Sequence, residues 1–305
     1  MIVIAAVGYG TLGVLSRFAT EAGISTITFV TWRALLGALI LIVSVALALG
    51  FGLIRSVRFA DVPPKHWLQI GTVAILNVVI NLAVFTGFEY ASIALVLICF
   101  YTYPVIVAVA ATRVYHEPLT GLRVAALALA SAGLVLVVVV PMLGQGDADV
   151  SAIGLLLGLL AAVAQAIHSL IAGRGYSSLP APQAAAALSV IQAIGFVGVA
   201  LLAGAASMLA EPFTVEGAWI WLILAATIGL AIPTAAVLAG YRRLGPTRAS
   251  ILMLLEPVVA VLLAALLLAE QPGLVQLVGG ALVLAGSLLA QVHRQPAPQP
   301  SAQPA

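Results

Sequence analysis

The chain is dominated by apolar runs that are long enough to cross a lipid bilayer as α-helices. A helix needs about 20 residues to span the hydrocarbon core. Ten runs of that kind follow one another, and short turns rich in proline, glycine and aspartate separate them. We therefore predict an all-α polytopic membrane protein with ten transmembrane helices. The expected spans are 2–20, 26–52, 66–88, 91–112, 119–141, 151–173, 181–206, 216–240, 244–269 and 274–292.

The low charge content also indicates a membrane environment. Only 7% of the residues are charged and 63% are hydrophobic, whereas a soluble domain carries about 25% charged residues. The net charge of +2, without a basic patch, argues against a nucleic-acid partner. The single cysteine, Cys99, lies in an apolar run, which excludes an intramolecular disulfide and a cysteine-based metal site. No basic stretch precedes the first run, which predicts a membrane helix rather than a cleaved signal.

One stretch of the chain occurs twice. Residues 87–133 align without a gap with residues 240–286, and each copy holds an apolar span with a proline in its middle, a turn with a glutamate and a second apolar span. Leucine-rich segments always match to some extent, so the shared positions of proline, glutamate and glycine are what indicate an internal duplication. The matched pairs are Gly87 and Gly240, Ile98 and Ile251, Pro104 and Pro257, Glu117 and Glu270, and Gly133 and Gly286.

The duplication divides the chain into two repeats of five spans. We expect the first repeat at 1–142, the second at 143–292 and a disordered tail at 293–305, which has nothing apolar to bury. Five crossings are an odd number, so the second repeat must enter the membrane upside down relative to the first. Inverted repeats of this kind are typical of transporters, whose halves move past each other around a site at mid-depth.

The charges in the loops agree with ten alternating crossings. Lysine and arginine outside the spans fall on one side of the membrane, and that side also holds both termini. By the positive-inside rule, this side is predicted to be cytoplasmic. The basic residues of this side are Arg55, Arg58, Lys65, Arg113, Arg174, Arg242, Arg243 and Arg294, with Arg123 and Arg248 just inside the spans that follow their loops, and the acidic residues of the other side are Glu21, Glu89, Asp147, Asp149, Glu211, Glu216 and Glu270.

These features resemble a known family. An arginine inside the second span (TWRALLGALI), the LEPVVA segment of the ninth and a glutamate after both the fourth and the ninth resemble the EamA branch of the drug/metabolite transporter superfamily, over the chain to about Val292. The resemblance implies a bacterial inner-membrane exporter of amino acids, including aromatic ones, or related metabolites. It implies no cofactor. The expected partners are a small-molecule substrate and the lipid bilayer, and a monomer is compatible with the pattern.

Two charged residues lie inside the predicted spans. Arg33 is about two turns into the second span, and Glu256 lies midway along the ninth. A charge at the bilayer centre costs about 2.5–3.5 kcal/mol on insertion scales. Two interpretations stay open: the two residues pair with each other and hold helices together, or they face a cavity and bind a substrate carboxylate or ammonium group. Arg17, near the end of the first span, is expected to extend to the interface.

Other polar side chains share helix faces. Asn77, Asn81 and Phe85 recur at every fourth residue of the third span, and Gln165 and His168 are three apart in the sixth. Such groups need partners from neighbouring helices or from a water-filled cavity, and both interpretations stay open. The residues expected to line a substrate cavity are Tyr9, Arg33, Asn77, Asn81, Phe85, Tyr101, Gln165, His168, Gln192 and Glu256.

Prolines interrupt three of the predicted spans. Pro104, Pro233 and Pro257 each free a carbonyl inside a helix, and lipid cannot satisfy that carbonyl. They are candidate hinges, and packing kinks are the simpler explanation. Tyr101 and Tyr103 cluster beside the first of these prolines at mid-depth, away from the interfaces where tyrosines concentrate.

Two segments only look like functional motifs. GYGTLG in the first span formally fits GxGxxG, but no strand precedes it, so dinucleotide binding is excluded. Gly10 and Gly13, like Gly154 and Gly158, are instead expected to let helices approach closely. HEPLT begins like the zinc motif HExxH, but a threonine stands where the second histidine is needed.

The predicted function is a secondary transporter, not an enzyme. No nucleophile, base or metal cluster is visible inside the spans, and no metal site is expected. An alternative substrate class is phosphorylated or nucleotide sugars, but phosphates call for several central lysines or arginines. A membrane receptor that binds without transporting is a second alternative, and ligand binding without flux would identify it.

Overall fold

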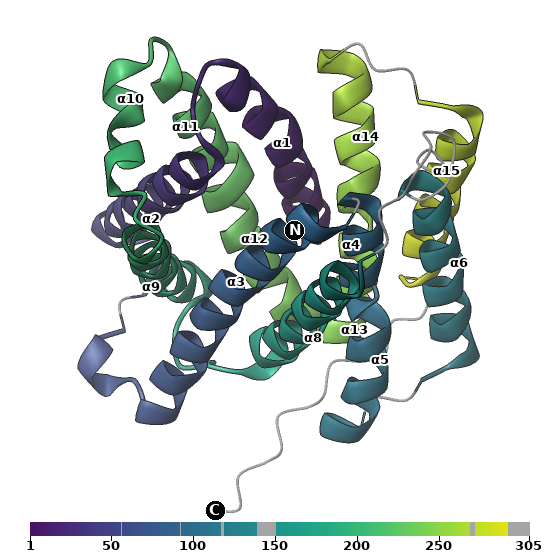
Figure 1. The fold of residues 1–305 in the computed structure, drawn as a ribbon. Helices are drawn as coiled ribbons and strands as arrows, with labels where there is room; N and C mark the ends of the chain where they lie inside the picture. Colours follow the sequence, from purple (N-terminus) through teal and green to yellow (C-terminus); the bar gives the residue numbers. More distant parts are fainter. Residues whose placement is uncertain (56, 92, 117–118, 139–150, 269–271, 292–305) are drawn as a thin grey trace, which may run out of the picture.

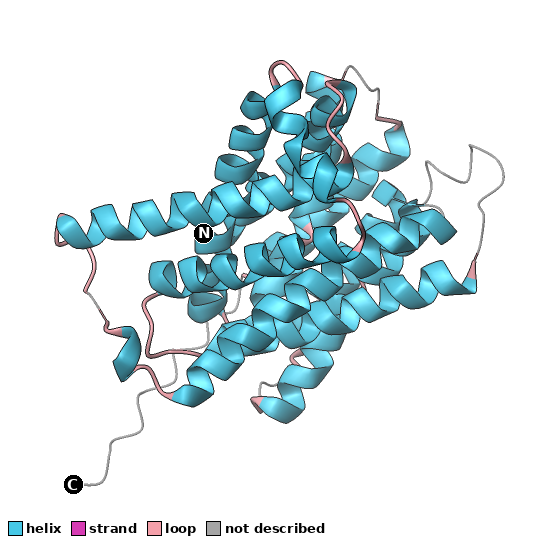
Figure 2. Ribbon diagram, turned by 60° about the vertical axis from the view of Figure 1, so that its left-hand side comes forward, coloured by secondary structure: helices cyan, strands magenta, loops and turns pink. Residues whose placement is uncertain are grey.

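The computed structural model describes residues 1–305 except 56, 92, 117–118, 139–150, 269–271 and 292–305. The two glutamates of the duplicated turn, Glu117 and Glu270, lie outside the described residues, as do Asp147, Asp149 and the predicted tail. The described part is helical with no β-strand, and its described connections are loops and turns (Figure 2). This confirms the prediction of an all-α protein.

The helices follow the predicted spans closely, and Figure 1 shows their arrangement. In chain order they are α1 (Ile2–Glu21), α2 (Thr26–Gly50), η1 (Phe59–Asp61), α3 (Pro64–Tyr90), α4 (Ile93–Phe100), α5 (Tyr103–Val114), α6 (Gly121–Val138), α8 (Ala152–Arg174), α9 (Ala181–Leu202), η2 (Ala206–Ala210), α10 (Glu211–Thr214), α11 (Ala218–Ala226), η3 (Thr227–Ala231), α12 (Ile232–Leu244), α13 (Pro246–Met253), α14 (Leu255–Leu267) and α15 (Leu274–Leu289).

Ten apolar spans are present in the described part of the chain. Nine of them are long enough and apolar enough to cross a membrane, and α15, with 16 residues, is a shorter tenth. The first five spans are α1, α2, α3, α4 with α5, and α6. The second five are α8, α9, α11 with α12, α13 with α14, and α15. Each half of the described chain therefore contains five apolar spans.

Three spans are interrupted beside their prolines. The fourth span, expected to be continuous, breaks between α4 and α5, and Pro104 is the second residue of α5. The ninth breaks at Leu254, and Pro257 lies in the first turn of α14. In the eighth, the π-helical turn η3 precedes Pro233. A proline lacks the N–H that a helix interior needs but fits a first helical turn, which explains why a new helix begins at each of them.

The packing of the helices is pseudo-symmetric. The third span packs on the sixth (α3 on α8), and the first packs on the eighth (α1 on α12). The fourth packs on the sixth (α4 on α8), and the first packs on the ninth (α1 on α14). Each of these contacts between the halves therefore has a counterpart with the halves exchanged. This is the pattern that two inverted five-helix repeats produce.

The two equivalent helices α6 and α15 lie side by side through glycines (Figure 1). A Cβ atom added at Gly133 would lie 2.5 Å from the carbonyl oxygen of Gly279, and one added at Gly286 would lie 2.7 Å from that of Ala126. Residue numbers rise along α6 as they fall along α15, so the helices are antiparallel. The absence of side chains at these glycines lets the two backbones touch.

Glycines also bring other helices together. Added Cβ atoms at Gly10, Gly154 and Gly158 would each come within about 3 Å of a neighbouring helix or the residue that follows one, which confirms that these positions allow close packing. The same expectation for Gly13 is wrong, because nothing lies within 4 Å of a Cβ there. Gly13 borders an open groove beside α14.

One end of the bundle collects basic residues and is called the basic end below. Here α3 begins near Lys65, α8 ends at Arg174 and α12 ends at Arg242 and Arg243. Arg242 donates hydrogen bonds to the turn after α8, and Gln69 of α3 accepts one from the same turn. These ends therefore lie together, as alternating crossings require.

The opposite end, called the acidic end, joins the turn between α1 and α2 to the segment around α10. The backbone N–H of Ser25 donates to the Glu211 carboxylate at 2.7 Å. The Trp32 indole N–H donates to the carbonyl of Leu209 at 2.9 Å, and its ring packs edge-on against Trp219. The acidic end is thus fastened by hydrogen bonds and aromatic packing between the two halves.

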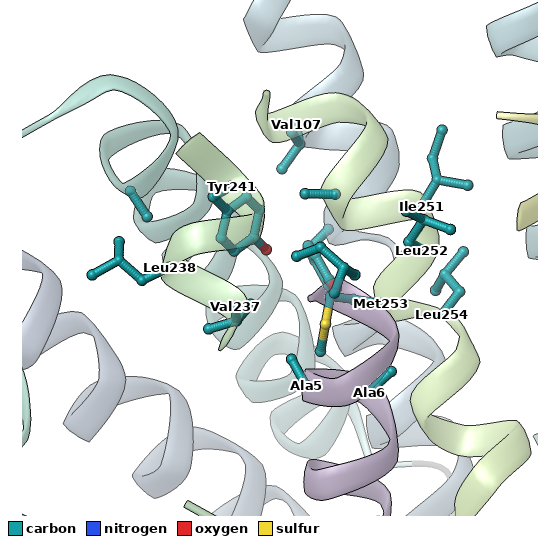
Figure 3. Packing of buried hydrophobic residues seen from close by; sticks show 14 of the residues in the cluster. Ala5, Ala6, Val107, Val237, Leu238, Tyr241, Ile251, Leu252, Met253 and Leu254 are labelled. Atoms are coloured by element: carbon teal, nitrogen blue, oxygen red, sulfur yellow. The ribbon is translucent and has the colours of Figure 1, made fainter. Parts of the chain in front are cut away.

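Small side chains of α1 pack beneath α12 and α13 at the centre of the largest apolar cluster. Ala5 and Ala6 are fully buried there with Val237 and Tyr241 of α12 and Met253 of α13 (Figure 3). Because Ala5 and Ala6 contribute only methyl groups here, the second half can approach this part of α1 closely. The packing holds in place the residues that line the cavity described next.

Candidate functional site

A cavity of about 170 Å³ lies between the two halves. The first four spans of the first half and the first four of the second all contribute to its wall. The sixth and eighth spans line it from mid-depth towards the basic end. Eight of the ten residues expected to line a cavity do so: Tyr9, Arg33, Asn77, Asn81, Gln165, His168, Gln192 and Glu256.

The other two expected residues are placed elsewhere. Phe85 is 40% exposed and packs edge-on against Phe88, outside the cavity lining. Tyr101 is buried at the break between α4 and α5, where its ring packs against Phe100. Its neighbour Tyr103 lines the cavity instead.

Arg33 brings a positive charge to the cavity without an anionic partner. Its side chain is 6% exposed, and its guanidinium carbon lies 5.9 Å from the centre of the Phe29 ring. Its Nε atom is buried and has no hydrogen-bond partner among the described residues. Within the same residues Arg33 forms no ion pair, so the alternative in which it pairs with Glu256 is not observed.

Glu256 brings the opposite charge from the other half. It lies in the first turn of α14, directly after the break at Leu254, and faces the cavity. Among the described residues it has no hydrogen bond and no ion pair. The cavity therefore holds one cation and one anion that do not neutralise each other by contact.

Tyr9 lies within electrostatic range of both charges. Its hydroxyl lies 3.2 Å from the Thr234 hydroxyl, and it is close enough to interact electrostatically with both Arg33 and Glu256. The aromatic wall of the cavity is completed by Phe100 and Tyr103. The charged groups thus lie among rings and hydroxyls rather than in open water.

The face of α8 carries a hydrogen-bonded polar group. The Ser169 hydroxyl donates to the carbonyl of Gln165 at 2.8 Å and lies 2.9 Å from the Tyr241 hydroxyl. His168 lines the cavity one residue earlier, and its Nδ1 atom has no partner within the described part. These contacts join α8 to α12 along the wall.

The amides supply neutral donors and acceptors. On α3 the Asn81 amide donates to the carbonyl of Asn77 at 2.8 Å, so one of its bonds is made within the helix. Gln192 of α9 is buried and lines the cavity. Together these side chains can bind polar groups of a ligand at several points.

Sequence reasoning missed several residues of the wall. Thr234 and Tyr241 lie seven residues apart on one face of α12, a spacing that could have indicated them. Tyr103 occupies the position that Glu256 holds in the duplicated stretch, so the alignment of the repeats already contained that signal. Tyr176 lies in a turn outside the spans, and no pattern pointed to it.

No metal centre is assembled in the described residues. Groups of three or more His, Cys, Asp or Glu side chains that could surround a metal ion do not occur there. The wall instead combines two opposite charges with amides, hydroxyls and aromatic rings. Such an arrangement can hold a small molecule that carries both charges.

Comparison with known proteins identifies a family and a fold. The chain matches the profile of the EamA-like transporter family over residues 1–139 and again over residues 152–291, once in each half. No curated protein is matched. A crystal structure described only as that of a protein superposes with a TM-score of 0.72 at 18% sequence identity, over 94% of this chain and 96% of that one. At this identity the likeness shows the fold alone.

Proposed function

Because the chain belongs to the EamA-like transporter family, we propose that it exports amino acids, including aromatic ones, or closely related small metabolites by alternating access. The two inverted halves enclose a cavity at mid-depth, which is where such transporters bind their substrates. The basic end is the cytoplasmic side in this proposal, which places both termini in the cytoplasm and the protein in the bacterial inner membrane.

The two unpaired charges carry the proposal of an amino-acid substrate. A buried charge without a partner is costly in a membrane, yet Arg33 and Glu256 both face the cavity without an ion pair among the described residues. A zwitterion would supply both missing partners. Its carboxylate can accept two hydrogen bonds from the Arg33 guanidinium, and its ammonium group can donate to Glu256.

The walls suit a small amphipathic molecule. Tyr9, Phe100 and Tyr103 offer aromatic surface for an apolar or aromatic side chain, and Asn77 and Asn81 offer amides. Among the described residues that line the cavity, Arg33 is the one lysine or arginine. A phosphorylated sugar would call for more positive charge than that.

The proline-associated breaks support movement of the halves. The interruptions beside Pro104 and Pro257 occupy equivalent positions in the two repeats, and the second adjoins Glu256. We propose that these breaks, with the π-helical turn before Pro233, are the hinges at which helices bend when the cavity changes sides.

A transport assay with matched substrates tests the proposal. Purified protein in liposomes would be given labelled phenylalanine, the amine that lacks its carboxylate and the acid that lacks its ammonium group, with and without a pH gradient. We expect flux of phenylalanine in the wild type. Arg33→Gln should lower the apparent affinity for phenylalanine about 30-fold, for a loss of about 2 kcal/mol, and should leave the amine unaffected.

The second variant reverses the pattern. Glu256→Gln should lower the apparent affinity for phenylalanine and leave the affinity for the acid unchanged. Arg17→Gln and Glu21→Gln are the matched controls, because this pair loses the same charges at the acidic end, away from the cavity. Equal effects of Arg33→Gln and Glu256→Gln on all three compounds would exclude zwitterion binding, and binding without flux would identify a receptor.

A further inference from the structure

The cavity is closed at the basic end. Two of its lining residues at mid-depth, Tyr9 and Glu256, are partly accessible. The lining residues towards the basic end are covered: Ala172 and Tyr241 are each 1% exposed, and Tyr176 is 0% exposed. A substrate that enters or leaves at this end must therefore displace one of these side chains.

Of the three residues that cover the basic end of the cavity, Tyr176 is the one that does not belong to a helix. It lies in the turn between α8 and α9, whereas Ala172 and Tyr241 belong to helices. Its φ angle is +37°, a left-handed conformation that is unfavourable for a residue with a large side chain. Such a conformation persists only where neighbouring groups hold it.

Two side chains from different halves hold the turn. The backbone N–H of Tyr176 donates to Oε1 of Gln69 at 2.7 Å. Arg242 donates to the carbonyl of Leu179 at 2.7 Å and to that of Tyr176 at 3.1 Å, and its guanidinium carbon lies 5.3 Å from the centre of the Tyr176 ring. Gln69 belongs to the third span and Arg242 to the eighth, which are equivalent in the two repeats.

The Tyr176 hydroxyl is buried without a partner among the described residues, in a residue that lines the cavity. A buried hydroxyl without a partner is costly, because it has given up its bonds to water. A polar group of a molecule in the cavity would supply the missing bond.

We propose that the turn of residues 175–179 is the gate at the basic end of the cavity, that Tyr176 blocks the passage, and that Gln69 and Arg242 latch it closed. In the closed state the Tyr176 hydroxyl contacts the substrate, so the gate also senses what the cavity holds. Only the identity of that substrate depends on the proposed transport function. Opening and closing of the gate can be measured without transport.

Thiol labelling measures the gate directly. Val237 lines the cavity on α12, deeper than Tyr176, and cysteine is close to valine in size. The reporter is Val237→Cys in a Cys99→Ala background, which removes the native thiol. A charged, membrane-impermeant methanethiosulfonate is added to the basic-end side of vesicles, and the rate of modification is followed. Leu188→Cys on α9 is a second reporter in the same cavity.

The latch variants predict distinct rates. Gln69→Leu should raise the labelling rate about fivefold, the factor that the loss of one ordinary hydrogen bond gives. Thr72→Val is the matched control on the same helix, since the Thr72 hydroxyl donates to its own helix at Leu68. Tyr176→Ala should raise the rate further. Tyr176→Phe keeps the ring and should label as slowly as the wild type.

The outcomes separate the gate from the transport proposal. If Gln69→Leu and Tyr176→Ala label no faster than Thr72→Val with both reporters, the gate is refuted, whatever the protein transports. If the rates change as expected but no amino acid moves, the gate stands and the proposed substrate fails. With the substrate established, Tyr176→Phe should lower its apparent affinity while the labelling rate stays unchanged.

Discussion

The contact between α6 and α15 allows a stability prediction to be worked out from distances. A Cβ atom at residue 133 would lie 2.5 Å from the carbonyl oxygen of Gly279 and 2.7 Å from the backbone nitrogen of Val283. Atoms in ordinary contact are about 3.5–4.0 Å apart. In Gly133→Ala the added methyl group would therefore lie about 1 Å too close to backbone atoms of α15. Backbone atoms cannot rotate away as a side chain can. The two helices have to move apart.

The expected cost follows from overpacking. Added methyl groups in a tightly packed interior typically cost about 1–3 kcal/mol, and a gap of about 0.5–1 Å loses a quarter to a half of each dispersion contact. For a chain of this size about 1 kcal/mol corresponds to about 2 °C. We expect the midpoint of thermal unfolding in detergent to fall by about 2–6 °C for Gly133→Ala.

Gly71→Ala is the matched control. Gly71 lies inside α3, and nothing is within 4 Å of a Cβ built there. Alanine favours a helix over glycine by about 1 kcal/mol, so this variant should be as stable as the wild type or more stable. The midpoints would be read from the monodisperse fraction that survives heating. Equal midpoints for Gly133→Ala and Gly71→Ala would refute the claim that backbone contact holds α6 to α15.

Three further predictions concern the hinges, the acidic end and the gate. Pro257→Ala should make α13 and α14 continuous. The maximal transport rate should then fall about tenfold, which corresponds to about 1.4 kcal/mol of activation barrier, with little change in substrate affinity. Initial transport rates measured against substrate concentration test this prediction. Glu211→Gln weakens the bond from Ser25 and should lower the free energy of unfolding by about 1 kcal/mol, measured by denaturant titration. Burial raises the pKa of the Tyr176 phenol, so the stability that the neutral phenol contributes is constant below pH about 10 and is lost above it. Thermal unfolding of wild type and Tyr176→Phe would be measured from pH about 7 to 11. The unfolding midpoint of the wild type should fall relative to that of the variant only at the alkaline end.

The spans could be predicted because each depends on its own residues. An apolar run of helical length and a turn-forming proline act locally, so the ten spans agree with the structure to within a few residues. The duplicated stretch then required the halves to be inverted. The break in the fourth span near Tyr101 was harder to place. Pro104 has no N–H to donate to the carbonyl one turn earlier, so the helix is interrupted before the proline rather than at it.

Site residues could be predicted where a charged or amide side chain lies inside an apolar span, because such a group is costly there without a function or a partner. Arg33 and Glu256 stood out on these grounds, but whether they pair depends on how two distant helices rotate, which spacing does not fix. Phe85 was misplaced for a simple reason. A step of four residues advances an α-helix by about 40° beyond a full turn, so Phe85 lies about 80° around α3 from Asn77 and leaves the cavity face.

The contact between α6 and α15 consists of the same pair of equivalent positions used twice. The alignment of the repeats equates Gly133 with Gly286 and Ala126 with Gly279, and the structure joins Gly133 to Gly279 and Gly286 to Ala126. The surface is therefore self-complementary, in the way that an isologous homodimer interface is. A five-helix half therefore carries both faces of this contact, so an upside-down copy of the same half could form it a second time.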